Sequence, residues 1–283
     1  MGKEYKYLVL DTETTSLKPW SKNGITDKDV KEYALSHPIV YDIGWVIINR
    51  KGEELVKRSY LVAEVFGNFD LFQSAYYADK RPKYCESIIK GEIEVKTWNE
   101  IAKILKLDMI QANYIGAFNS AFDFFRAIPF TERYISSLYS GNFSEWREKF
   151  TEILPKEKGK KAKRTKRSND EWDFRGLTLP LFDVYDMLCD KHKDNKSFKE
   201  FCVKNEKFSD SKKYFSTNAE TFYQYTFGAL DFVEDHTALS DATIEAKLLV
   251  KLLQKKAVKV GFDYFPFQKI GRVDRYIEGK KRD

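Results

Sequence analysis

Four acidic side chains in three separate stretches of the sequence have the types and surroundings that metal-dependent chemistry requires. They are Asp11 and Glu13 in LVLDTETTSL, Asp123 in GAFNSAFDFFRA and Asp241 in EDHTALSDATIEAKLL. Each stands among apolar residues, where a carboxylate loses hydration and where like charges repel unless they are paired or bind cations. Carboxylate oxygens suit hard divalent cations such as Mg2+ and Mn2+, and two such ions about 4 Å apart suit phosphodiester hydrolysis.

A histidine, His236, lies five residues before Asp241. A neutral imidazole beside bound cations can take the proton from an attacking water molecule. The other two histidines have different surroundings: His37 precedes Pro38, and His192 lies in the charged stretch DKHKDNK, so we expect both to be solvated. His236 is therefore the candidate general base.

The pattern of apolar residues predicts the elements that must position these side chains. Residues 5–10 (YKYLVL) favour a strand covered on both faces, which places Asp11 at or near its C-terminal end. Asp11 and Glu13, two residues apart, then share one face of that strand and can share one cation. The polar residues 14–36 follow as a predicted loop.

Further elements complete the expected centre of the fold. Residues 39–49 (IVYDIGWVIIN) and 54–62 (ELVKRSYLV) predict an antiparallel hairpin. Residues 97–106 predict a helix that begins with a capping box, and residues 113–118 (NYIGAF) predict the next strand. Strands mixed with helices in this way indicate an α/β fold.

Two helices should carry the remaining candidate residues. A helix over residues 120–125, expected to end near Pro129, places Asp123 in its first turn. Residues 236–256 have apolar residues at helical spacing, and Asp241 lies near the start of that helix, where the helix dipole favours a carboxylate. Asp241 can therefore meet the strand face that carries the first two carboxylates.

Together these stretches resemble the DnaQ-like, or DEDDh, 3'-5' exonucleases, which have a ribonuclease-H-like fold. DTET at 11–14, NSAFD at 119–123 and HTALSDA at 236–242 are similar to the three motifs of the family, in order and with the third in its histidine form. The resemblance covers about residues 5–128 and 179–254. It departs from the family at Phe118, where a histidine is often found, and in a long connection over residues 129–178.

The resemblance implies a role for each candidate residue. Asp11, Glu13 and Asp241 would hold one Mg2+ or Mn2+ ion. Asp11 would bridge to a second ion, Asp123 would assist there through water, and His236 would be the general base.

The resemblance also implies that residues around the first two motifs bind the 3'-terminal nucleotide. The positions that match are Thr12, Thr14, Thr15, Asn119 and Phe122. Phe122, Phe124 and Phe125 could also offer a stacking face for bases, although packing in an apolar core is the expectation we favour.

The length of 283 residues exceeds a typical domain of about 150 residues, and we expect one enlarged domain. This mixed-sheet exonuclease-like domain would span residues 1–258, with a basic insertion at about 141–178. Residues 259–283 form an aromatic and basic C-terminal tail. The three cysteines lack metal-site spacing and are expected to be reduced, buried thiols; they are Cys85, Cys189 and Cys202.

The positive charge is concentrated in one segment. Of the net +6, residues 155–167 (PKEKGKKAKRTKR) carry +7, which leaves −1 for the rest of the chain. Such a run fits a solvated loop or an arm that binds nucleic-acid phosphates, and the sequence leaves both open.

We expect a cytoplasmic protein without a membrane segment. The sequence enters a predicted strand by residue 5, which leaves no room for a signal peptide. No apolar stretch approaches the roughly 20 residues that a membrane span requires.

The expected function is metal-dependent 3'-5' exonuclease activity on single-stranded DNA or frayed duplex ends, by a two-metal mechanism. An exoribonuclease or RNA-trimming enzyme on the same fold stays open, because the sequence does not show a contact to the 2'-hydroxyl. A non-catalytic nucleic-acid-binding or polymerase-associated module is a third hypothesis, against which the intact set of five site residues argues. A polymerase or replication partner also stays open.

Overall fold

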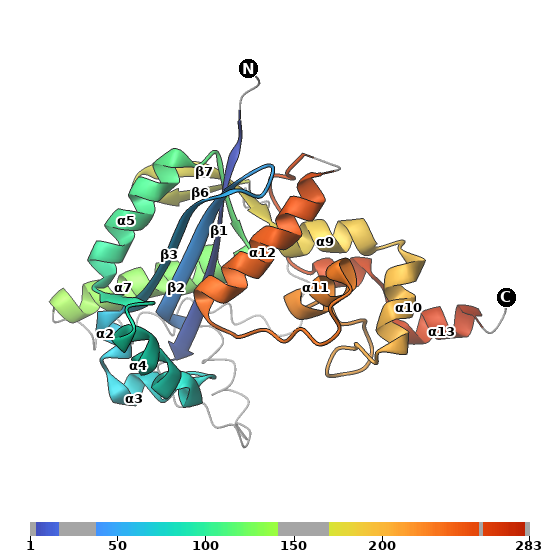
Figure 1. Ribbon diagram of the computed structural model, residues 1–283, viewed down its shortest axis with the longest axis horizontal. Helices are drawn as coiled ribbons and strands as arrows, with labels where there is room; N and C mark the ends of the chain where they lie inside the picture. Colours follow the sequence, from blue (N-terminus) through green and yellow to red (C-terminus); the bar gives the residue numbers. More distant parts are fainter. Residues whose placement is uncertain (1–3, 17–37, 141–169, 255–256, 281–283) are drawn as a thin grey trace, which may run out of the picture.

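The computed structural model describes residues 4–16, 38–140, 170–254 and 257–280. Within these residues, seven strands form one mixed sheet in the order β4-β3-β2-β1-β5-β7-β6, with helices on both faces (Figure 1). The fold is α/β, a mixed sheet flanked by helices, as the sequence predicts. None of the described helices is both long and apolar enough to cross a membrane.

The centre of the sheet is β1 (Lys6–Ser16) between an antiparallel and a parallel neighbour. The antiparallel neighbour is β2 (Pro38–Asn49), which forms the predicted hairpin with β3 (Glu54–Val62), and the parallel neighbour is β5 (Tyr114–Ala117). β1 is longer than predicted, because Thr14, Thr15 and Ser16 still pair with β2. Asp11 therefore lies in the middle of the strand rather than at its end.

The outer strands extend the sheet on both sides. β3 pairs in parallel with β4 (Glu94–Lys96), and β5 pairs in parallel with β7 (Leu177–Asp183), which pairs antiparallel with β6 (Glu171–Phe174). The predicted basic insertion at 141–178 thus ends in an edge strand. Its residues 141–169, including the basic run, lie outside the described residues.

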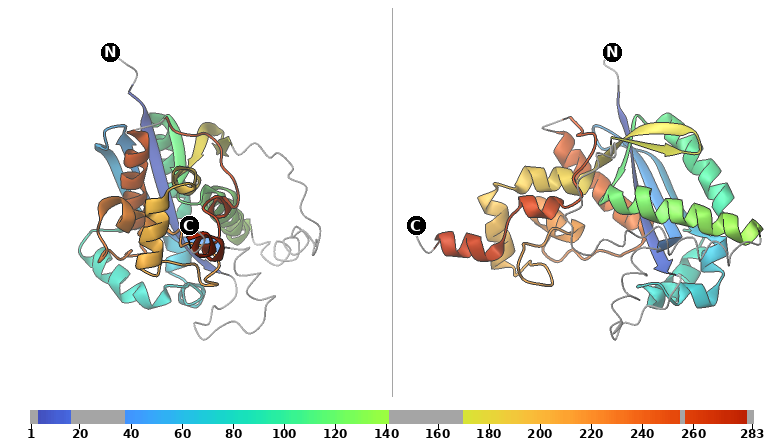
Figure 2. Two further views of the ribbon diagram at one scale, coloured as in Figure 1. Left: turned by 90° about the vertical axis from the view of Figure 1, so that its right-hand side faces the viewer. Right: turned by 180° about the vertical axis from the view of Figure 1, so that it is seen from behind.

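Alternate residues of β1 pack into two separate hydrophobic cores. Leu8 and Leu10 pack towards α5 (Trp98–Gln111) and α7 (Ile128–Ser140), which cross the face seen in the right-hand view of Figure 2. Tyr7 and Val9 pack in the second core, with α9 (Val184–His192), α11 (Ala219–Phe227) and α12 (Ala238–Leu253). Asp11 and Glu13 have the same phase as Tyr7 and Val9, so they follow the face that α12 covers.

Helix α5 begins as predicted. Thr97 accepts a hydrogen bond from the backbone of Glu100, and the Glu100 side chain accepts one from the backbone of Thr97. This capping box satisfies two backbone donors of the first turn and fixes where the helix begins.

Short helices between β3 and β4 lie beside the C-terminal end of β1 (Figure 1). They are α2 (Ala63–Phe66), α3 (Phe69–Phe72), η1 (Ala78–Lys80) and α4 (Arg81–Ile89). Phe66, Phe72 and Tyr84 anchor them in the first core, where their rings contact one another edge to face.

The helix around Asp123 differs from the prediction. It is built from α6 (Ser120–Phe122), a π-helical turn η2 (Asp123–Ala127) and α7. Pro129 does not end the helix. It directly follows the π-helical turn, where the regular i→i−4 hydrogen-bond pattern is already interrupted.

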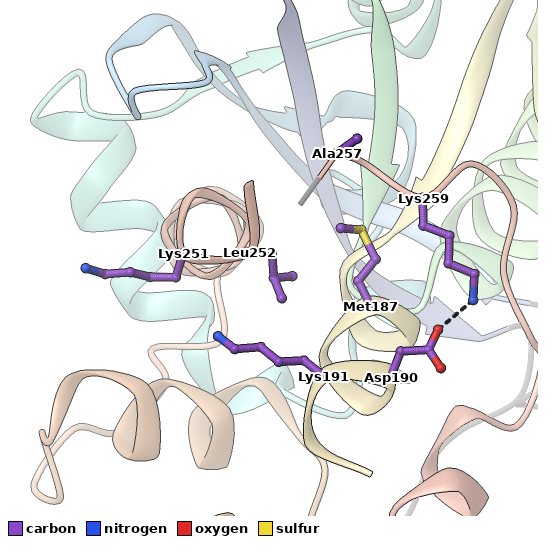
Figure 3. A pocket seen from close by; sticks show the side chains of 7 residues that line it. All are labelled: Met187, Asp190, Lys191, Lys251, Leu252, Ala257 and Lys259. Carbon is purple, nitrogen blue, oxygen red and sulfur yellow. Dashed lines mark hydrogen bonds and ion pairs between the residues drawn. The ribbon is translucent and has the colours of Figure 1, made fainter. Parts of the chain in front are cut away.

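The C-terminal tail packs back onto the domain. The Gly261 N–H donates to the Leu181 carbonyl over 2.8 Å, and Lys259 and Lys269 pair with the buried Asp186. The tail continues through η3 (Pro266–Lys269) to α13 (Val273–Lys280), next to α10 (Lys196–Lys204). A hollow of about 160 Å³ lies between α9 and α12 and is lined by Met187, Leu252 and the ion pair of Lys259 with Asp190 (Figure 3). None of the candidate site residues lines it.

Two sequence-based expectations were wrong. His192 is not solvated: its side chain is 1% exposed and stacks against Phe198 and Phe222. Cys85 is exposed, whereas Cys189 and Cys202 are buried, and all three are free thiols. His37 lies outside the described residues.

Candidate active site

Gly44 lets the first turn of α12 contact the sheet beside Asp11. Gly44 is the partner of Asp11 across the β1–β2 ladder, and a Cβ at Gly44 would lie 2.3 Å from the backbone nitrogen of Leu239. No side chain fits in that space, so a glycine is required for the helix to approach this closely. The approach brings Asp241, the fourth residue of α12, to the strand that carries Asp11 and Glu13.

Asp42 holds the start of α12 in place. It lies opposite Glu13 on β2, is fully buried, and accepts hydrogen bonds from the Ala238 N–H (3.0 Å) and the Tyr84 hydroxyl (2.8 Å). Burial raises the pKa of Asp42 to about 6, although both donors oppose the rise. Through this carboxylate, α4 and β2 together fix the first turn of α12.

Three of the predicted residues come together at the open side of the site. One ligand atom each from Glu13, His236 and Asp241 lies within 4.8 Å of the other two. Oδ1 of Asp241 is buried and has no hydrogen-bond partner among the described residues. A buried carboxylate oxygen without a donor is an atom that a cation would satisfy.

Asp123 enters the site from the turn after β5. Its side chain is 2% exposed, and the Thr12 hydroxyl donates to Oδ1 over 2.6 Å. Burial raises the pKa of Asp123 to about 7. The turn that aims it has Asn119 in the left-handed region (φ 71°), followed by Ser120, whose N–H donates to the buried Asp183 over 2.8 Å.

Glu245 is a fifth carboxylate of the cluster that sequence reasoning missed. It is 3% exposed and accepts a hydrogen bond from the Phe118 N–H over 3.0 Å. Its position four residues after Asp241 places both side chains on one face of α12. The available signal was this spacing, together with a charged residue between the apolar Ile244 and Ala246.

The ring of His236 is held by the short helices after β3. It stacks on Tyr77 with the ring centroids 4.6 Å apart, and the Lys80 ammonium donates to the His236 carbonyl over 3.2 Å. Nδ1 lies 3.8 Å from Asp241 Oδ2 and 3.9 Å from Glu234 Oε2. Interaction with Asp241 raises the pKa of His236, against a smaller opposing effect of burial.

The cluster carries strong mutual repulsion. Burial raises the pKa of Asp11 well above its ordinary range, and the charges of Glu245 and Asp123 raise it further. Burial and then Asp241 likewise raise the pKa of Glu13, which Lys80 partly offsets. Crowded oxygen ligands, repulsion and the unpartnered oxygen of Asp241 all fit a site for hard divalent cations.

The predicted nucleotide-binding residues have different surroundings. Thr12 and Thr15 are buried, with hydroxyls turned to Asp123 and to the Ile39 carbonyl, whereas Thr14 is half-buried and Asn119 is exposed. Among the phenylalanines, Phe124 is fully buried against Trp172, while Phe122 and Phe125 are half-buried against the first core.

No protein-family model matches the chain, and a search among curated proteins finds no significant match. Among solved structures, the chain is similar to one described as "3'-end specific recognition of histone mRNA stem-loop by 3'-exonuclease". The TM-score is 0.39 and the identity 9%, over 92% of this chain and 87% of that chain. At this level of similarity the match carries no argument about activity, so any functional conclusion depends on the geometry of the site.

Proposed function

We propose that the protein is a cation-dependent 3'-5' exonuclease that acts on the ends of single-stranded DNA. The observation that carries this proposal is the grouping of Glu13, Asp241 and His236, one ligand atom of each lying within 4.8 Å of the other two. The charges of Glu13, Asp123 and Asp241 also act on Asp11 of β1. The four carboxylates come from three distant stretches of the chain: Asp11 and Glu13 from β1, Asp123 from η2, and Asp241 from α12.

The carboxylates would hold the cations. Glu13 and Asp241, with Asp11, would hold one ion, and Asp11 and Asp123 would serve a second. When bound, two divalent cations would polarise the scissile phosphate and stabilise both the attacking and the leaving oxygen.

His236 would act as the general base. Its Nδ1 faces Asp241 and Glu234, which favours a proton on that nitrogen. In that tautomer Nε2 carries the free lone pair, to which none of the described residues is hydrogen-bonded, and it can accept the proton of the attacking water. The Tyr77 ring limits how the imidazole can turn, so the base stays aimed at the cluster.

The choice of the 3' end rests on the motif resemblance. The half-buried Thr14 and the exposed Asn119 have side chains that a terminal nucleotide could reach. Thr12 would act mainly by holding Asp123, since its hydroxyl already donates to that carboxylate. The Thr15 side chain is buried against β2, so only the backbone of Thr15 would contact a substrate.

The proposal is tested with a 5'-labelled single-stranded DNA oligonucleotide in the presence of Mg2+ or Mn2+. The expected result is a ladder of shortened products that disappears with EDTA and with Asp11→Asn. A 3'-labelled strand would release mononucleotide first, which fixes the polarity. Absence of shortening with either cation, or shortening of equal rate in Asp11→Asn, would refute the proposal.

An RNA strand of the same sequence belongs in the same experiment. Faster shortening of RNA would replace DNA by RNA as the substrate and leave the cation site unchanged, since the 2'-hydroxyl is the group that distinguishes the two. Binding of either strand without cleavage would instead support a non-catalytic binding module.

A further inference from the structure

The backbone of His236 has a conformation that its own segment does not explain. Its φ of 48° lies in the left-handed region, which is uncommon for a residue other than glycine. Residues 232–237 form neither helix nor strand, and Thr237, the N-cap residue of α12, makes no capping hydrogen bond through its side chain. Contacts from elsewhere in the fold must therefore hold this turn.

Lys80 supplies such contacts to the backbone. Its ammonium group donates to the carbonyl oxygen of Asp235 and to that of His236, the latter over 3.2 Å. These two carbonyls belong to the planar peptide units on either side of the His236 Cα atom. A charged donor that binds both carbonyls therefore fixes the two peptide planes, and with them the direction in which the side chain leaves the backbone.

The same lysine also contacts the ring on which His236 stacks. The Lys80 N–H donates to the Tyr77 carbonyl over 3.0 Å, which places the two residues one turn apart on the same side of η1. Lys80 Nζ lies 4.4 Å from the centre of the Tyr77 ring, within the range of a cation–π contact. The His236 imidazole stacks on that ring with 13° between the planes.

We infer that Lys80 is a positioning residue, which holds the imidazole of His236 against the acidic cluster through two backbone carbonyls and the Tyr77 ring. The effect on catalysis rests on the proposed function, in which His236 is the general base.

Lys83 provides a matched control on the next turn. It pairs with the side chain of Asp235 and, among the described residues, makes no hydrogen bond to either carbonyl. Both side chains of this pair are about half exposed (51% and 47%), so the pair should contribute little. Lys83→Met removes a cation from the same surface without removing a contact to the His236 backbone.

The kinetic test compares Lys80→Met and Lys80→Arg with this control. Methionine is unbranched and cannot donate, so kcat for shortening of the labelled strand should fall roughly 10-fold while KM stays within about two-fold of wild type. Arginine can donate to both carbonyls and should restore most of the rate. Lys83→Met should match wild type. A raised KM with unchanged kcat in Lys80→Met would make Lys80 a contact to substrate phosphates and overturn the inference.

A double variant tests whether Lys80 acts through His236. In the His236→Asn background, Lys80→Met should cause no further loss of rate, because the group that it positions is already absent. An equal loss in both backgrounds would overturn the inference.

NMR spectra of the metal-free full chain test the position of the ring without catalysis. The chain has three histidines, and the imidazole resonances of His236 are those missing from His236→Asn. At a pH above the pKa of His236, the Tyr77 ring should shift its Hε1 resonance upfield in wild type, Lys80→Arg and Lys83→Met, and this shift should be lost in Lys80→Met. The amide resonances of the same samples show whether each variant is folded.

The outcomes separate the inference from the proposed function. An unchanged Hε1 resonance in a folded Lys80→Met variant would overturn the inference, whatever the activity. Wild type that shortens neither DNA nor RNA would overturn the proposed function, while loss of the shift in Lys80→Met would still identify Lys80 as the residue that positions the His236 ring.

Discussion

The inner and outer halves of the candidate site are built in different ways. The inner half is Asp11, Asp123 and Glu245, three carboxylates set on a central strand and two helices; Asp123 and Glu245 are almost completely buried. The outer half is Glu13, His236 and Asp241, where the histidine side chain is 33% exposed and is supported by Tyr77 and Lys80. The inner half is therefore governed by charge, whereas the outer half combines two carboxylates with an oriented histidine.

This difference gives the two halves different sensitivities. Removing a charge from the inner half should abolish cation binding while relieving repulsion in the metal-free protein. Changing the support of the outer half should alter rates and pH dependence while leaving cation binding intact. Four predictions test this contrast, the first three on catalysis and the last on a region outside both halves.

The largest effect is expected for Asp123→Asn in the inner half. Asparagine keeps the oxygen that accepts the Thr12 hydroxyl but loses the charge, so activity should fall on the order of 1,000-fold. The melting temperature without metal should rise, since a buried carboxylate in a crowded cluster is removed. Single-turnover rates and thermal unfolding measure both, and a rate within a few-fold of wild type would contradict a second cation held at the inner half.

His236→Asn in the outer half should lower the rate by about 100-fold, the usual range for loss of a general base. Wild-type activity should fall as the pH decreases through the pKa of His236, because protonation removes the lone pair. Asp241 raises that pKa, so the decrease should begin above the ordinary value of about 6.5. This acidic limb should be absent in His236→Asn.

Mn2+ titration of His236→Asn provides the control. Retained binding identifies the histidine as a base, whereas lost binding would make it a cation ligand, which its distance to Glu13 and Asp241 also permits. A pH profile that is the same in wild type and variant would exclude the proposed role.

A smaller effect is expected for Tyr77→Ala, which removes the ring on which His236 stacks. Such a contact contributes about 0.5–1.5 kcal/mol, so the rate should decrease roughly 2- to 10-fold. Tyr77→Phe keeps the ring and should match wild type. Steady-state kinetics decide the result, and equal rates for the alanine and phenylalanine variants would show that the stacking does not orient the base.

No effect on activity is expected for His192→Phe, because His192 belongs to neither half of the site. Burial lowers the pKa of His192 to about 4, so the unfolded state takes up a proton first as the pH falls. Stability should therefore decrease between pH 6.5 and 4, by about 1–2 kcal/mol between pH 7 and 5.

Urea unfolding at pH 7 and pH 5 measures this difference. His192→Phe should lack that part of the loss, while its activity at pH 7 stays at the wild-type level. An identical pH dependence in wild type and variant would show that His192 does not contribute it. Burial lowers the pKa of His192, whereas the neighbouring Asp241 raises the pKa of His236. The two histidines together would show that an acidic neighbour reverses the direction of the shift.

Local sequence patterns were sufficient for much of the fold and of the site. The hairpin and the capped helix α5 were predicted because apolar alternation and a capping box act over a few residues. The approach of Asp241 to Glu13 was predicted because strand and helix geometry places them on facing surfaces.

What the sequence did not reveal depends on packing between distant segments. Glu245 was missed because its partner, the Phe118 N–H, is 127 residues away. His192 was misjudged from its charged neighbours, although Val184, Leu188 and His192 recur every four residues on the buried face of α9. The need for Gly44 appears only when α12 lies on β2.

If the proposed function holds, the docking of α12 against Gly44 also determines when the site is complete during synthesis. Asp11, Glu13 and Asp123 leave the ribosome before His236, Asp241 and Glu245 do. A nascent chain with the proposed activity would thus remain inert beside the messenger that encodes it. Fragments released by premature termination before α12 would be inert as well, which limits damage to cellular nucleic acids from incomplete copies.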